Sequence, residues 1–468
     1  MSAPDERPGE LPGRGEVLVR GAWVLTVGAA GEVRDGAVHV RDGAVVEVAP
    51  FEALQRRLPD VAVVGDGTGI VAPGFVNAHT HLSEAYVTGI GSELALWEWG
   101  ERIVGPVGTA LVRDDACEGT KLRAVEMLLS GVTCVNDMFV HAHPGSMATL
   151  GVVDGLTAAG LRGVVSFGAE DAYPTTEALA SAGVGSVLDE QEALADAADA
   201  TELVGFRYGI GTLLGQSDGL LADGLALCHD RGWGVHTHLA EVRMEGPAAE
   251  KRWGARPVEA ARRLGVFDTP AIVGHAIWVD DDEIVELART GVAVAHNPVA
   301  NMILGSGVCP LARLRGAGIA VGIGTDGAAS NDSQDMLQAV KMAALLQKVH
   351  HVDPGVVSAD DVLAMATIDG ARALGLDHLI GSLDPGKRAD LVLYQGTVDV
   401  AVLHDPVGQL VYGASPRSVR DVWVDGRRVV ADRQPVTLDE TALVAATGAR
   451  AARIAHESGL AAAGVSRL

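Results

Sequence analysis

The stretch Pro73-Gly74-Phe75-Val76-Asn77-Ala78-His79-Thr80-His81 is a short apolar run that ends in two histidines. A run of this length after a Pro-Gly pair is typical of a buried strand. Seven similar runs follow, and segments with apolar residues at helical spacing lie between them. The predicted strands span residues 75–78, 132–137, 163–167, 204–209, 234–238, 271–275, 292–296 and 319–324. The clearest predicted helices span residues 117–129, 257–264, 283–290 and 333–347. Strands that alternate with helices predict an α/β fold, and eight parallel strands predict a (β/α)8 TIM barrel.

Short β-like segments flank this central region on both sides. The turn Asp42-Gly43 separates two runs with alternating β-branched residues, 37–40 and 45–48, and this pattern predicts a hairpin. Similar runs return at 389–394 and 421–430. We therefore expect a small composite β-sandwich domain built from both chain ends, residues 1–70 plus 384–468, and a barrel domain over residues 71–383. The Ala-rich segment from residue 438 predicts a closing helix packed on the flanking sheet.

The composition favours a small-molecule partner. The chain has 468 residues, a formal net charge of −25 and a sequence pI near 4.9. This charge would repel nucleic acid or an acidic membrane surface. The N-terminal segment lacks the apolar core of a signal peptide and no 18-residue apolar run is free of charge, so we expect a cytoplasmic protein. Four widely spaced cysteines without a CxxC pair argue against disulfides and a thiolate zinc site.

Polar side chains at the ends of four predicted strands form a candidate metal site. His79 and His81 follow the first strand, His238 the fifth, His275 the sixth and Asp326 the eighth. The C-terminal ends of barrel strands face one common pocket, and the two histidines of His-x-His point to the same side of an extended segment. Each residue alone has an ordinary structural interpretation, such as a turn position for Asp326. Their joint placement at strand ends instead favours an N/O site for Zn²⁺ or Fe²⁺.

Glu241 follows His238 by three residues and is a candidate proton shuttle. A carboxylate one step beyond a ligand strand can lie beside the water at the metal without binding the metal itself. The alternative is an acid in the first turn of the following helix. The neighbouring metal candidates favour the catalytic role.

Several motifs resemble the amidohydrolase superfamily, specifically its mononuclear deaminase branch. The resemblance runs from residues 73–81 to Gly381-Ser382-Leu383-Asp384-Pro385-Gly386-Lys387-Arg388-Ala389-Asp390-Leu391, and includes Ala295-His296-Asn297-Pro298 and residues 322–332. The chain is similar to S-adenosylhomocysteine/methylthioadenosine deaminases, 8-oxoguanine deaminases and s-triazine aminohydrolases. A lysine bridge between two metals is not available, because the chain has no lysine between Lys121 and Lys251.

The resemblance implies a role for each candidate residue. It makes His79, His81, His238 and Asp326 the ligands of one divalent ion, Zn²⁺ or alternatively Fe²⁺. It also assigns proton transfer to Glu241, and the holding of the water at the metal to His275. Asp326 can take a proton from that water as it attacks an amino-bearing ring carbon. Relatives are commonly homo-oligomers, dimers or larger.

The predicted function is hydrolytic deamination. The chain would replace an exocyclic amino group of an N-heteroaromatic compound, purine-like or adenosine-like, with oxygen and release ammonia. An s-triazine amino- or chlorohydrolase, or a cyclic amide hydrolase, would use the same ion. A non-catalytic binding barrel is disfavoured, because neither a ligand nor Glu241 is missing.

The substrate-binding positions depart from those of the relatives. Nucleoside deaminases tend to carry Thr-Arg-Gly after the third strand, whereas this chain has Ser166-Phe167-Gly168. A Pro-His-Ser segment after the fourth strand is replaced by residues 209–212, and an acidic residue expected near Pro106 is replaced by Val107-Gly108. These changes argue against a nucleoside. The loop residues that we predict to line the pocket are Trp97, Trp99, Phe139, His141, Asn301 and Met302. A second His-x-His at residues 141–143 is not predicted to bind metal.

Overall fold

All the predicted strand runs form parallel strands in the computed structural model, which describes residues 11–172 and 183–460. The strands are β6 Phe75–Thr80, β7 Val132–Val140, β8 Arg162–Gly168, β9 Val204–Phe206, β10 Tyr208–Thr212, β11 Val235–Leu239, β12 Ala271–His275, β13 Ala293–His296 and β14 Val321–Ile323. They form a four-stranded sheet in the order β6-β7-β8-β9 and a five-stranded sheet in the order β10-β11-β12-β13-β14. The fourth predicted run is divided at Arg207 between β9 and β10, so that it contributes to both sheets.

The two parallel sheets meet at both of their edges. An isolated parallel bridge pairs Ala169, after β8, with Ile210 of β10. At the other edge the backbone N–H of Asp326 donates to the carbonyl of His79 at 3.0 Å, and an added Cβ at Gly322 of β14 would lie 2.6 Å from Ala78 Cβ of β6. Within the described residues, no ladder of paired residues joins β14 to β6. The fold is therefore α/β with parallel sheets.

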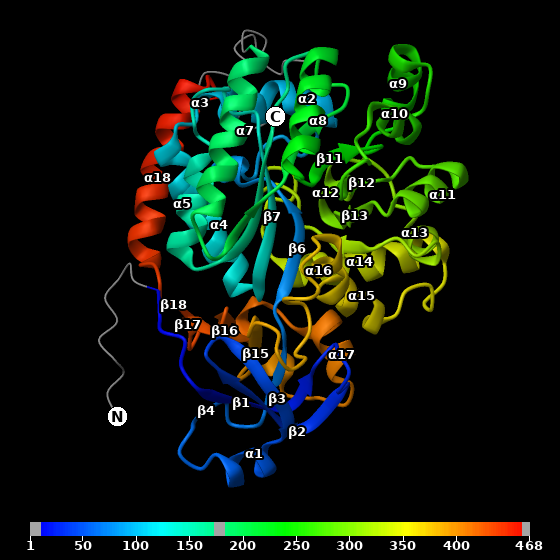
Figure 1. Cartoon of the computed structure of the whole chain (residues 1–468). Coiled ribbons are helices and arrows are strands. Elements are labelled where there is room, and N and C mark those ends of the chain that lie inside the picture. Colours follow the sequence, from blue (N-terminus) through cyan, green and yellow to red (C-terminus); the bar gives the residue numbers. More distant parts are fainter. Residues whose placement is uncertain (1–10, 173–182, 461–468) are drawn as a thin grey trace.

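Helices follow the strands and lie around them (Figure 1). They are α4 Arg113–Leu129, α5 Leu150–Ala159, α7 Val184–Asp199, α8 Asp218–Arg231, α9 Glu245–Trp253, α10 Pro257–Leu264, α11 Asp281–Thr290, α12 Pro298–Ile303, α13 Leu311–Gly316, α14 Met336–His351, α15 Ala359–Met365 and α16 Ile368–Ala373. The four predicted helices are confirmed as α4, α10, α11 and α14. Two of them begin at side-chain caps, because Asp280 accepts from the backbone N–H of Glu283 and Asp335 from that of Leu337.

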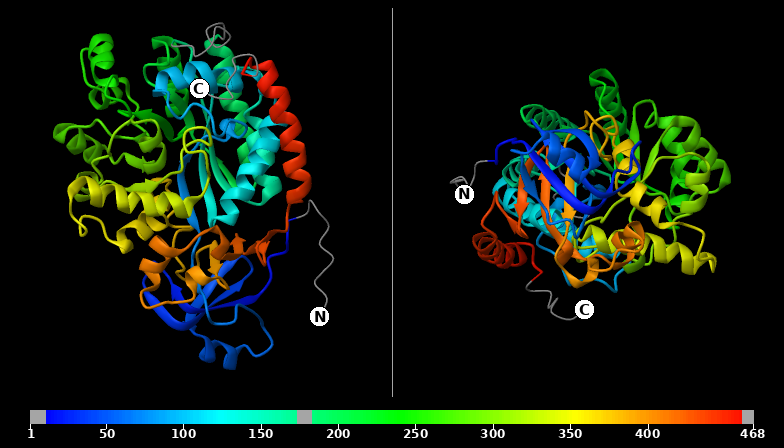
Figure 2. Two further views of the ribbon diagram at one scale, coloured as in Figure 1. Left: turned by 180° about the vertical axis from the view of Figure 1, so that it is seen from behind. Right: turned by 90° about the horizontal axis from the view of Figure 1, so that it is seen from below.

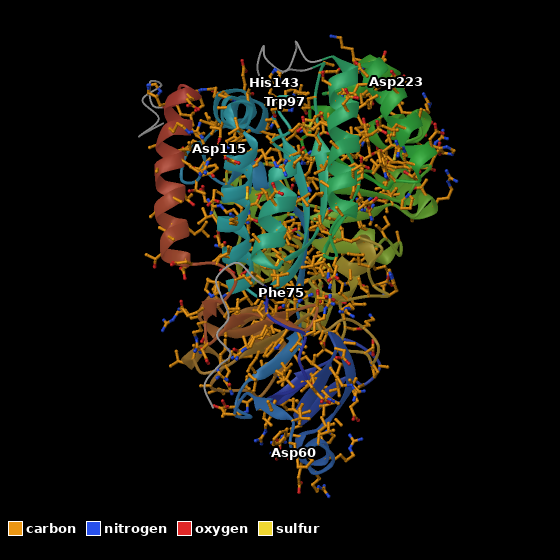
Figure 3. The ribbon with its side chains drawn as sticks, turned by 60° about the vertical axis from the view of Figure 1, so that its left-hand side comes forward. Asp60, Phe75, Trp97, Asp115, His143 and Asp223 are labelled. Carbon is orange, nitrogen blue, oxygen red and sulfur yellow. The ribbon has the colours of Figure 1, made fainter. Side chains whose placement is uncertain are left out.

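A shorter group of elements follows β6 and leads over the C-terminal ends of the strands. It consists of η1 Leu82–Glu84, α2 Leu96–Trp99, η2 Gly100–Val104 and α3 Gly105–Ala110. Trp97 of α2 lies at the end of the molecule opposite the flanking sheet, whereas Phe75, at the start of β6, lies between the two parts (Figure 3). This group therefore sits on the side where the polar strand ends meet. In the part of the chain that the structure describes, no helix combines the length and the apolar character needed to cross a bilayer.

The two ends of the chain form one sheet. Its strands are β1 Val17–Leu25, β2 Glu32–Arg41, β3 Ala44–Pro50, β4 Ala62–Val64, β5 Ile70–Pro73, β15 Leu391–Tyr394, β16 Val419–Val424, β17 Arg427–Ala431 and β18 Gln434–Pro435. The order is β18-β17-β16-β15-β5-β1-β2-β3, with β4 on β1. The predicted hairpin is confirmed as the antiparallel pair β2–β3. Seen from below, these strands lie in front of the helices (Figure 2, right).

The expected sandwich of two sheets is not confirmed, since the described strands give a single nine-stranded sheet. This sheet is strongly curved. Ala389 connects two distant turns, because its N–H donates to Gly43 O at 2.9 Å and its carbonyl accepts from Gly426 N at 3.0 Å. Gly43 lies in the β2–β3 turn and Gly426 in the β16–β17 turn, at opposite parts of the strand order. The curvature closes the sheet around an apolar core of its own that includes Val38 and Trp423.

The Ala-rich C-terminal segment forms the predicted helix, α18 Glu440–Glu457, but lies elsewhere than expected. It runs along α4 rather than over the flanking sheet (Figures 1 and 2). Arg450 Nη1 lies 2.8 Å from Asp115 Oδ1, and Arg453 bonds to the same oxygen. Asp115 is fully buried beside this helix (Figure 3). The Ala-rich composition of this segment predicted a helix, but not the buried carboxylate that fixes its position.

Candidate active site

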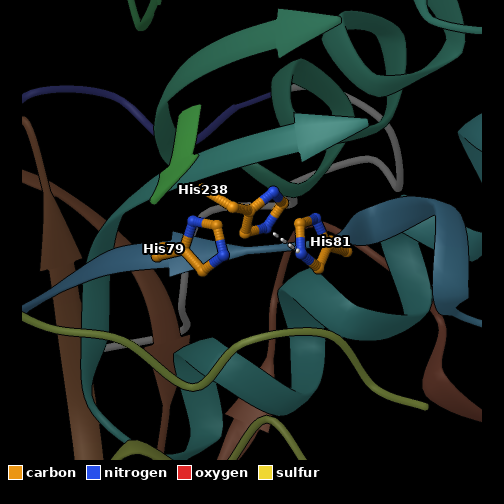
Figure 4. Close-up of side chains that lie close together, drawn as sticks. All are labelled: His79, His81 and His238. Atoms are coloured by element: carbon orange, nitrogen blue, oxygen red, sulfur yellow. Dashed lines mark hydrogen bonds between the residues drawn. The ribbon is translucent and has the colours of Figure 1, made fainter. Parts of the chain in front are cut away.

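Four of the predicted residues converge at the C-terminal ends of the parallel strands. His79 Nε2 lies 3.4 Å and His81 Nε2 3.1 Å from Asp326 Oδ1. The Nε2 atoms of His81 and His238 are 3.1 Å apart (Figure 4). We call His79, His81, His238 and Asp326 the His/Asp cluster. It joins the ends of β6, β11 and β14, as the strand assignment predicted.

Backbone carbonyls orient two histidines of the His/Asp cluster. His81 Nδ1 lies 2.7 Å from Met138 O, and His238 Nδ1 lies 2.6 Å from Gly211 O. A carbonyl only accepts, so each Nδ1 carries a hydrogen. Both Nε2 atoms face the interior of the cluster. Bonds of this type fix the tautomer of a metal-binding histidine.

His79 is held by a second histidine that the sequence analysis did not select. His79 Nδ1 lies 2.8 Å from His236 Nε2, and His236 Nδ1 lies 3.1 Å from Ser166 Oγ. Ser166 in turn donates to Asp137 O at 2.8 Å. This chain of hydrogen bonds allows His79 to donate from Nδ1 and to keep a lone pair on Nε2. A signal for His236 was present, because it precedes His238 by two residues on one strand.

The His/Asp cluster is able to hold one divalent metal ion. His79 Nε2 and Asp326 Oδ1 are buried and have no hydrogen-bond partner in the described structure. Buried polar atoms without partners are rare, and here they face one another within a group of mutually close ligand atoms. Burial lowers the pKa of His79 to about 4, so this imidazole is neutral at pH 7 as metal binding requires. Three imidazoles and a carboxylate suit Zn²⁺ or Fe²⁺.

Glu241 and His275 lie beside the His/Asp cluster. Glu241 Oε2 is 3.5 Å from His275 Nε2, and Glu241 Oε1 accepts from Ser306 Oγ at 3.3 Å. His275 Nε2 is 4.0 Å from Asp326 Oδ2. Burial raises the pKa of Glu241 to about 7. A carboxyl group with this pKa can both give and take a proton near neutral pH.

The loop that carries Glu241 is tied down by an acid four residues further on. The carboxylate of Glu245, at the start of α9, accepts from the backbone N–H groups of Ala240, Glu241 and Val242 at 2.8, 2.8 and 3.0 Å. Such bonds fix the backbone on both sides of Glu241. Glu245 could be expected from sequence only as an acid of the first helical turn.

One residue of the His/Asp cluster and its neighbour His275 have an unusual backbone. His275 has φ 72° and Asp326 has φ 64°, in the left-handed region that residues with a Cβ rarely adopt. His275 Nδ1 donates to Asn301 Oδ1 at 2.8 Å, which directs Nε2 toward Glu241. Gly324 admits the close approach of its neighbours, because a Cβ there would lie 2.3 Å from Asn297 Oδ1. Strained backbone of this kind is concentrated at functional sites.

The His/Asp cluster opens into a cavity of about 350 Å³. Its volume is within the range of small-molecule sites. The apolar part of its wall is formed by Leu96, Trp97, Trp99, Val140, Leu214, Ala248 and Leu304. The side chains with acidic or hydroxyl groups that line it are Glu84, Glu101, Glu170, Thr212, Glu241, Glu245, Asp326 and Ser330.

Three of the six pocket candidates line this cavity and three do not. Trp97, Trp99 and His141 lie in its wall. Phe139 is fully buried in the core behind it. Asn301 is buried and bonds to His275, so it orients a neighbour of the cluster. Met302 is 41% exposed and lines a separate surface hollow with residues of α14.

Four acids of the cavity, Glu84, Glu101, Glu170 and Glu245, were not predicted from the sequence. Glu84 follows His81 by three residues, and Glu170 follows β8 by two. Burial raises the pKa of the Glu84 and Glu170 carboxyl groups to about 7. The signal for Glu170 was its position at the C-terminal end of a parallel strand, the same signal that identified the cluster.

Comparisons with known proteins agree on one family. A model of the amidohydrolase family matches residues 70–429. A 5-methylthioadenosine/S-adenosylhomocysteine deaminase from Desulforudis audaxviator is 36% identical over 437 residues, which cover 91% of this chain and 95% of that relative. The structure of an adenosine deaminase from Xanthomonas campestris with bound zinc has a TM-score of 0.85 at 29% identity, covering 95% of this chain and 99% of that one. An atrazine chlorohydrolase from Arthrobacter aurescens complexed with zinc has a TM-score of 0.84 at 25% identity, covering 93% of this chain and 100% of that one.

Proposed function

This chain belongs to the amidohydrolase family, and we propose that it is a metal-dependent hydrolase that removes an exocyclic amino group from a purine-like N-heterocycle. The observation that carries the proposal is the placement of Glu241 and His275 beside the His/Asp cluster at the base of a cavity. The relatives named as deaminases of adenosine and its derivatives support the choice of a purine ring.

His79, His81, His238 and Asp326 would hold the metal ion, and zinc is the ion in both structures named above. An ion bound there lowers the pKa of water to about 7 and so makes hydroxide available at neutral pH. The protein orients the ligand rings. The bonds of His81 and His238 to backbone carbonyls place a ring hydrogen on Nδ1 and turn Nε2 toward the place of the ion.

Glu241 carries the proton that the reaction moves. Addition of water to the amino-bearing ring carbon breaks aromaticity, and a proton on the adjacent ring nitrogen offsets that cost. Burial raises the pKa of Glu241 to about 7, so its carboxyl group can both give and take a proton near neutral pH. It gives a proton to the ring nitrogen and regains one from the adding water through Asp326. The amino group then takes up a proton as the added hydroxyl group loses one, and the C–N bond breaks to release ammonia and leave the oxo product.

His275 would hold the attacking water, because the Nε2 of a ring whose Nδ1–H donates to Asn301 can accept a hydrogen bond. Its Nδ1–H is engaged with Asn301, and its Nε2 lies toward Glu241 and Asp326. The imidazole is thus fixed before substrate binds. Such preorganised groups cost no reorganisation during the reaction.

The proposal extends to the architecture that holds this site. We assign residues 71–383 to a catalytic barrel of eight parallel strands, and residues 1–70 plus 384–468 to a composite β-domain that bears the C-terminal helix. Contact between β6 and β14, through Asp326 N and His79 O, supports closure of the barrel. We also propose that the protein works as a homo-oligomer, a dimer or larger.

A triazine is the second candidate substrate, because the chlorohydrolase structure resembles this chain as closely in TM-score as the adenosine deaminase does. The same hydroxide would displace chloride or an amine from a triazine carbon. The two candidates differ in the product released.

The test is a release assay with the zinc-loaded full-length protein. Adenosine, adenine, guanine and pterin derivatives are assayed for ammonia, and chloro- and aminotriazines for chloride and amine. Ammonia from a purine, together with loss of that activity after chelation and recovery with zinc, supports the proposal. Chloride release without purine turnover would replace it by the triazine alternative, and no turnover of any compound would refute both.

A further inference from the structure

Glu170 faces the active-site cavity, but the reaction described above makes no use of it. Thr212 Oγ1 donates to Glu170 Oε1 at 3.2 Å. In the described part of the chain, no cationic side chain acts on this carboxylate. A partly buried carboxylate of this kind retains capacity to accept hydrogen bonds.

The backbone around Glu170 is fixed on both sides. Gln216 Nε2 donates to the carbonyl of Ala169 at 2.8 Å, and Asp171 N donates to Gly215 O at 2.9 Å. The residues before and after Glu170 are therefore tied to the loop after β10. The side chain projects into the cavity from a held position, which suits a binding residue.

A single residue, Gly211, lies between Glu170 and the His/Asp cluster and contacts both. A Cβ at Gly211 would lie 2.9 Å from Glu170 Cγ, and a Cβ at Gly215 would lie 2.5 Å from Glu170 Oε1. The carbonyl of Gly211 also accepts the hydrogen bond from His238. A ring that reacts at the cluster therefore has its substituents within reach of Glu170. Larger residues at these two glycines would block that approach.

The cavity is lined by acidic side chains. Six of its described lining residues are Asp or Glu, and no described lining residue is Lys or Arg. A phosphate or carboxylate beside Glu170 would find no cationic lining side chain, and it would repel the ionised form of the Glu170 carboxyl group. A hydroxyl or an ammonium group would instead satisfy the carboxylates.

Resting on the deaminase function, we propose that Glu170 is a substrate-binding residue that accepts hydrogen bonds from hydroxyl or ammonium groups on the substituent of the reacting ring. The same carboxylate selects against substituents that bear a phosphate or a carboxylate. The substrate class is thus a neutral or cationic amino-purine derivative with donor groups on its side arm.

The experiment compares the zinc-loaded wild type with Glu170→Gln on four probes that share the adenine ring. Two offer donors, adenosine and 5′-amino-5′-deoxyadenosine, one is anionic, adenosine 5′-carboxylic acid, and 9-methyladenine has no polar substituent. We expect kcat/KM to fall about 10- to 100-fold for the two donor probes, since a hydrogen bond to a charged group is lost. For 9-methyladenine, kcat/KM of the variant should stay within a few-fold of the wild-type value. The ratio of kcat/KM for the 5′-amino probe to that for the 5′-carboxylate probe should fall by tenfold or more.

Two further variants complete the design. Gly215→Ala directs a methyl group onto the Glu170 carboxylate and should reproduce the pattern. Glu192→Gln removes a carboxylate on the surface of α7 that pairs with Arg231, and should leave all four probes unchanged. Binding of inosine, measured by calorimetry, adds a readout that needs no turnover and should weaken in Glu170→Gln.

The outcomes separate the two proposals. If Glu170→Gln lowers kcat/KM equally for all four probes, the role of Glu170 is overturned. The same holds if it changes neither kcat/KM nor inosine binding. Both outcomes leave the deaminase function intact. If the wild type releases ammonia from none of the probes, the adenine deaminase function fails. Inosine binding then decides on Glu170 alone, with equal or absent binding in both proteins counting against it.

Discussion

The carboxyl group of Glu241 derives its reactivity from its surroundings. It is buried next to His275, and burial raises its pKa to about 7. Glu241→Gln keeps the shape and the bond from Ser306 but can no longer exchange a proton. We expect kcat to fall by about 10²–10⁴ while zinc content is unchanged. Steady-state ammonia release measures kcat, and elemental analysis of the same preparation measures the zinc content. A kcat within a few-fold of wild type would rule out the shuttle role of Glu241.

Substitution of a metal ligand, unlike that of Glu241, should lower the zinc content. His238→Ala and Asp326→Ala each remove one donor from the His/Asp cluster, so zinc content per chain should fall along with activity. His143→Ala is the matched control, because it removes a histidine of the second His-x-His, whose Nδ1 lies 2.9 Å from Pro144 O and not in the cluster. Full zinc occupancy in both ligand variants, by elemental analysis after dialysis, would contradict their assignment.

Glu170 should make folding stability depend on pH. Its pKa is raised by burial from 4.5 to about 7, so between these values the unfolded chain loses a proton that the folded chain keeps. The free energy of unfolding of the wild type therefore falls over this range because of Glu170. Glu170→Gln lacks that loss, so its stability relative to wild type should increase from pH 4.5 to 7 by up to about 3 kcal/mol. Urea unfolding at pH 5 and 7.5 measures the difference, with Glu192→Gln as surface control, and a pH-independent difference would refute the shift.

Sequence alone predicted the cluster residues because each has two signals at once, a metal-binding side chain and a place at a strand end. His79, His238 and Asp326 are examples, and they do converge. Asn301 had only its place near a motif, so its contact with His275 could not be distinguished from contact with substrate. Glu170 had only one of these signals, its place just after the end of a strand. Its approach to the cavity depends on the loop packed against it, which is a feature of the tertiary structure.

At the level of elements, apolar periodicity predicted strands and helices well because burial imposes it. The fourth strand shows its limit. The run 204–209 was apolar enough to indicate one strand, yet Arg207 interrupts it, and β9 and β10 join different sheets. Arg207 is buried and donates to Leu374 O at 3.0 Å. A break of this kind depends on a partner far along the chain.

The docking of α18 on α4 depends on one buried carboxylate and can be tested. Asp115 accepts from Arg450 and Arg453, and also caps the start of α4 through Val112 N at 3.2 Å. Asp115→Ala should lower the free energy of unfolding by about 1.5–3 kcal/mol and speed amide exchange in α18. Asp114→Ala, the exposed neighbour, is the control. Hydrogen-exchange mass spectrometry that finds α18 equally protected in both variants would contradict the anchor.

At the scale of the whole molecule, both chain ends meet in one sheet that lies under the parallel strands. The alternating flanks predicted strands at each end, and these strands form one curved sheet, so the expected sandwich of two sheets is not confirmed. The pairing of β5 with β15 brings together residues about 320 positions apart. The local sequence pattern carries no information on such a pairing. The curvature of the sheet likewise depends on contacts between distant turns, such as those of Gly43 and Gly426.

The flanking sheet and the parallel strands are joined by a buried ion pair that should control the stability of the whole fold. Arg162, which begins β8, donates from Nε and Nη2 to Asp390 at 2.9 and 3.1 Å, and both side chains are almost fully buried. Removal of one partner leaves an uncompensated charge, so Arg162→Met should lower the free energy of unfolding by about 3–5 kcal/mol. Arg162→Met combined with Asp390→Leu should recover much of that loss, since neither partner of the pair is then left as an unpaired buried charge, and the buried Asp425 next to Arg162 keeps its bonds to Arg14 and Arg388. Arg113→Met is the control, because it breaks an exposed pair with Asp154 and should cost about 1 kcal/mol or less. In urea unfolding monitored by tryptophan fluorescence, a loss as small for Arg162→Met as for Arg113→Met would show that this pair does not hold the two parts together.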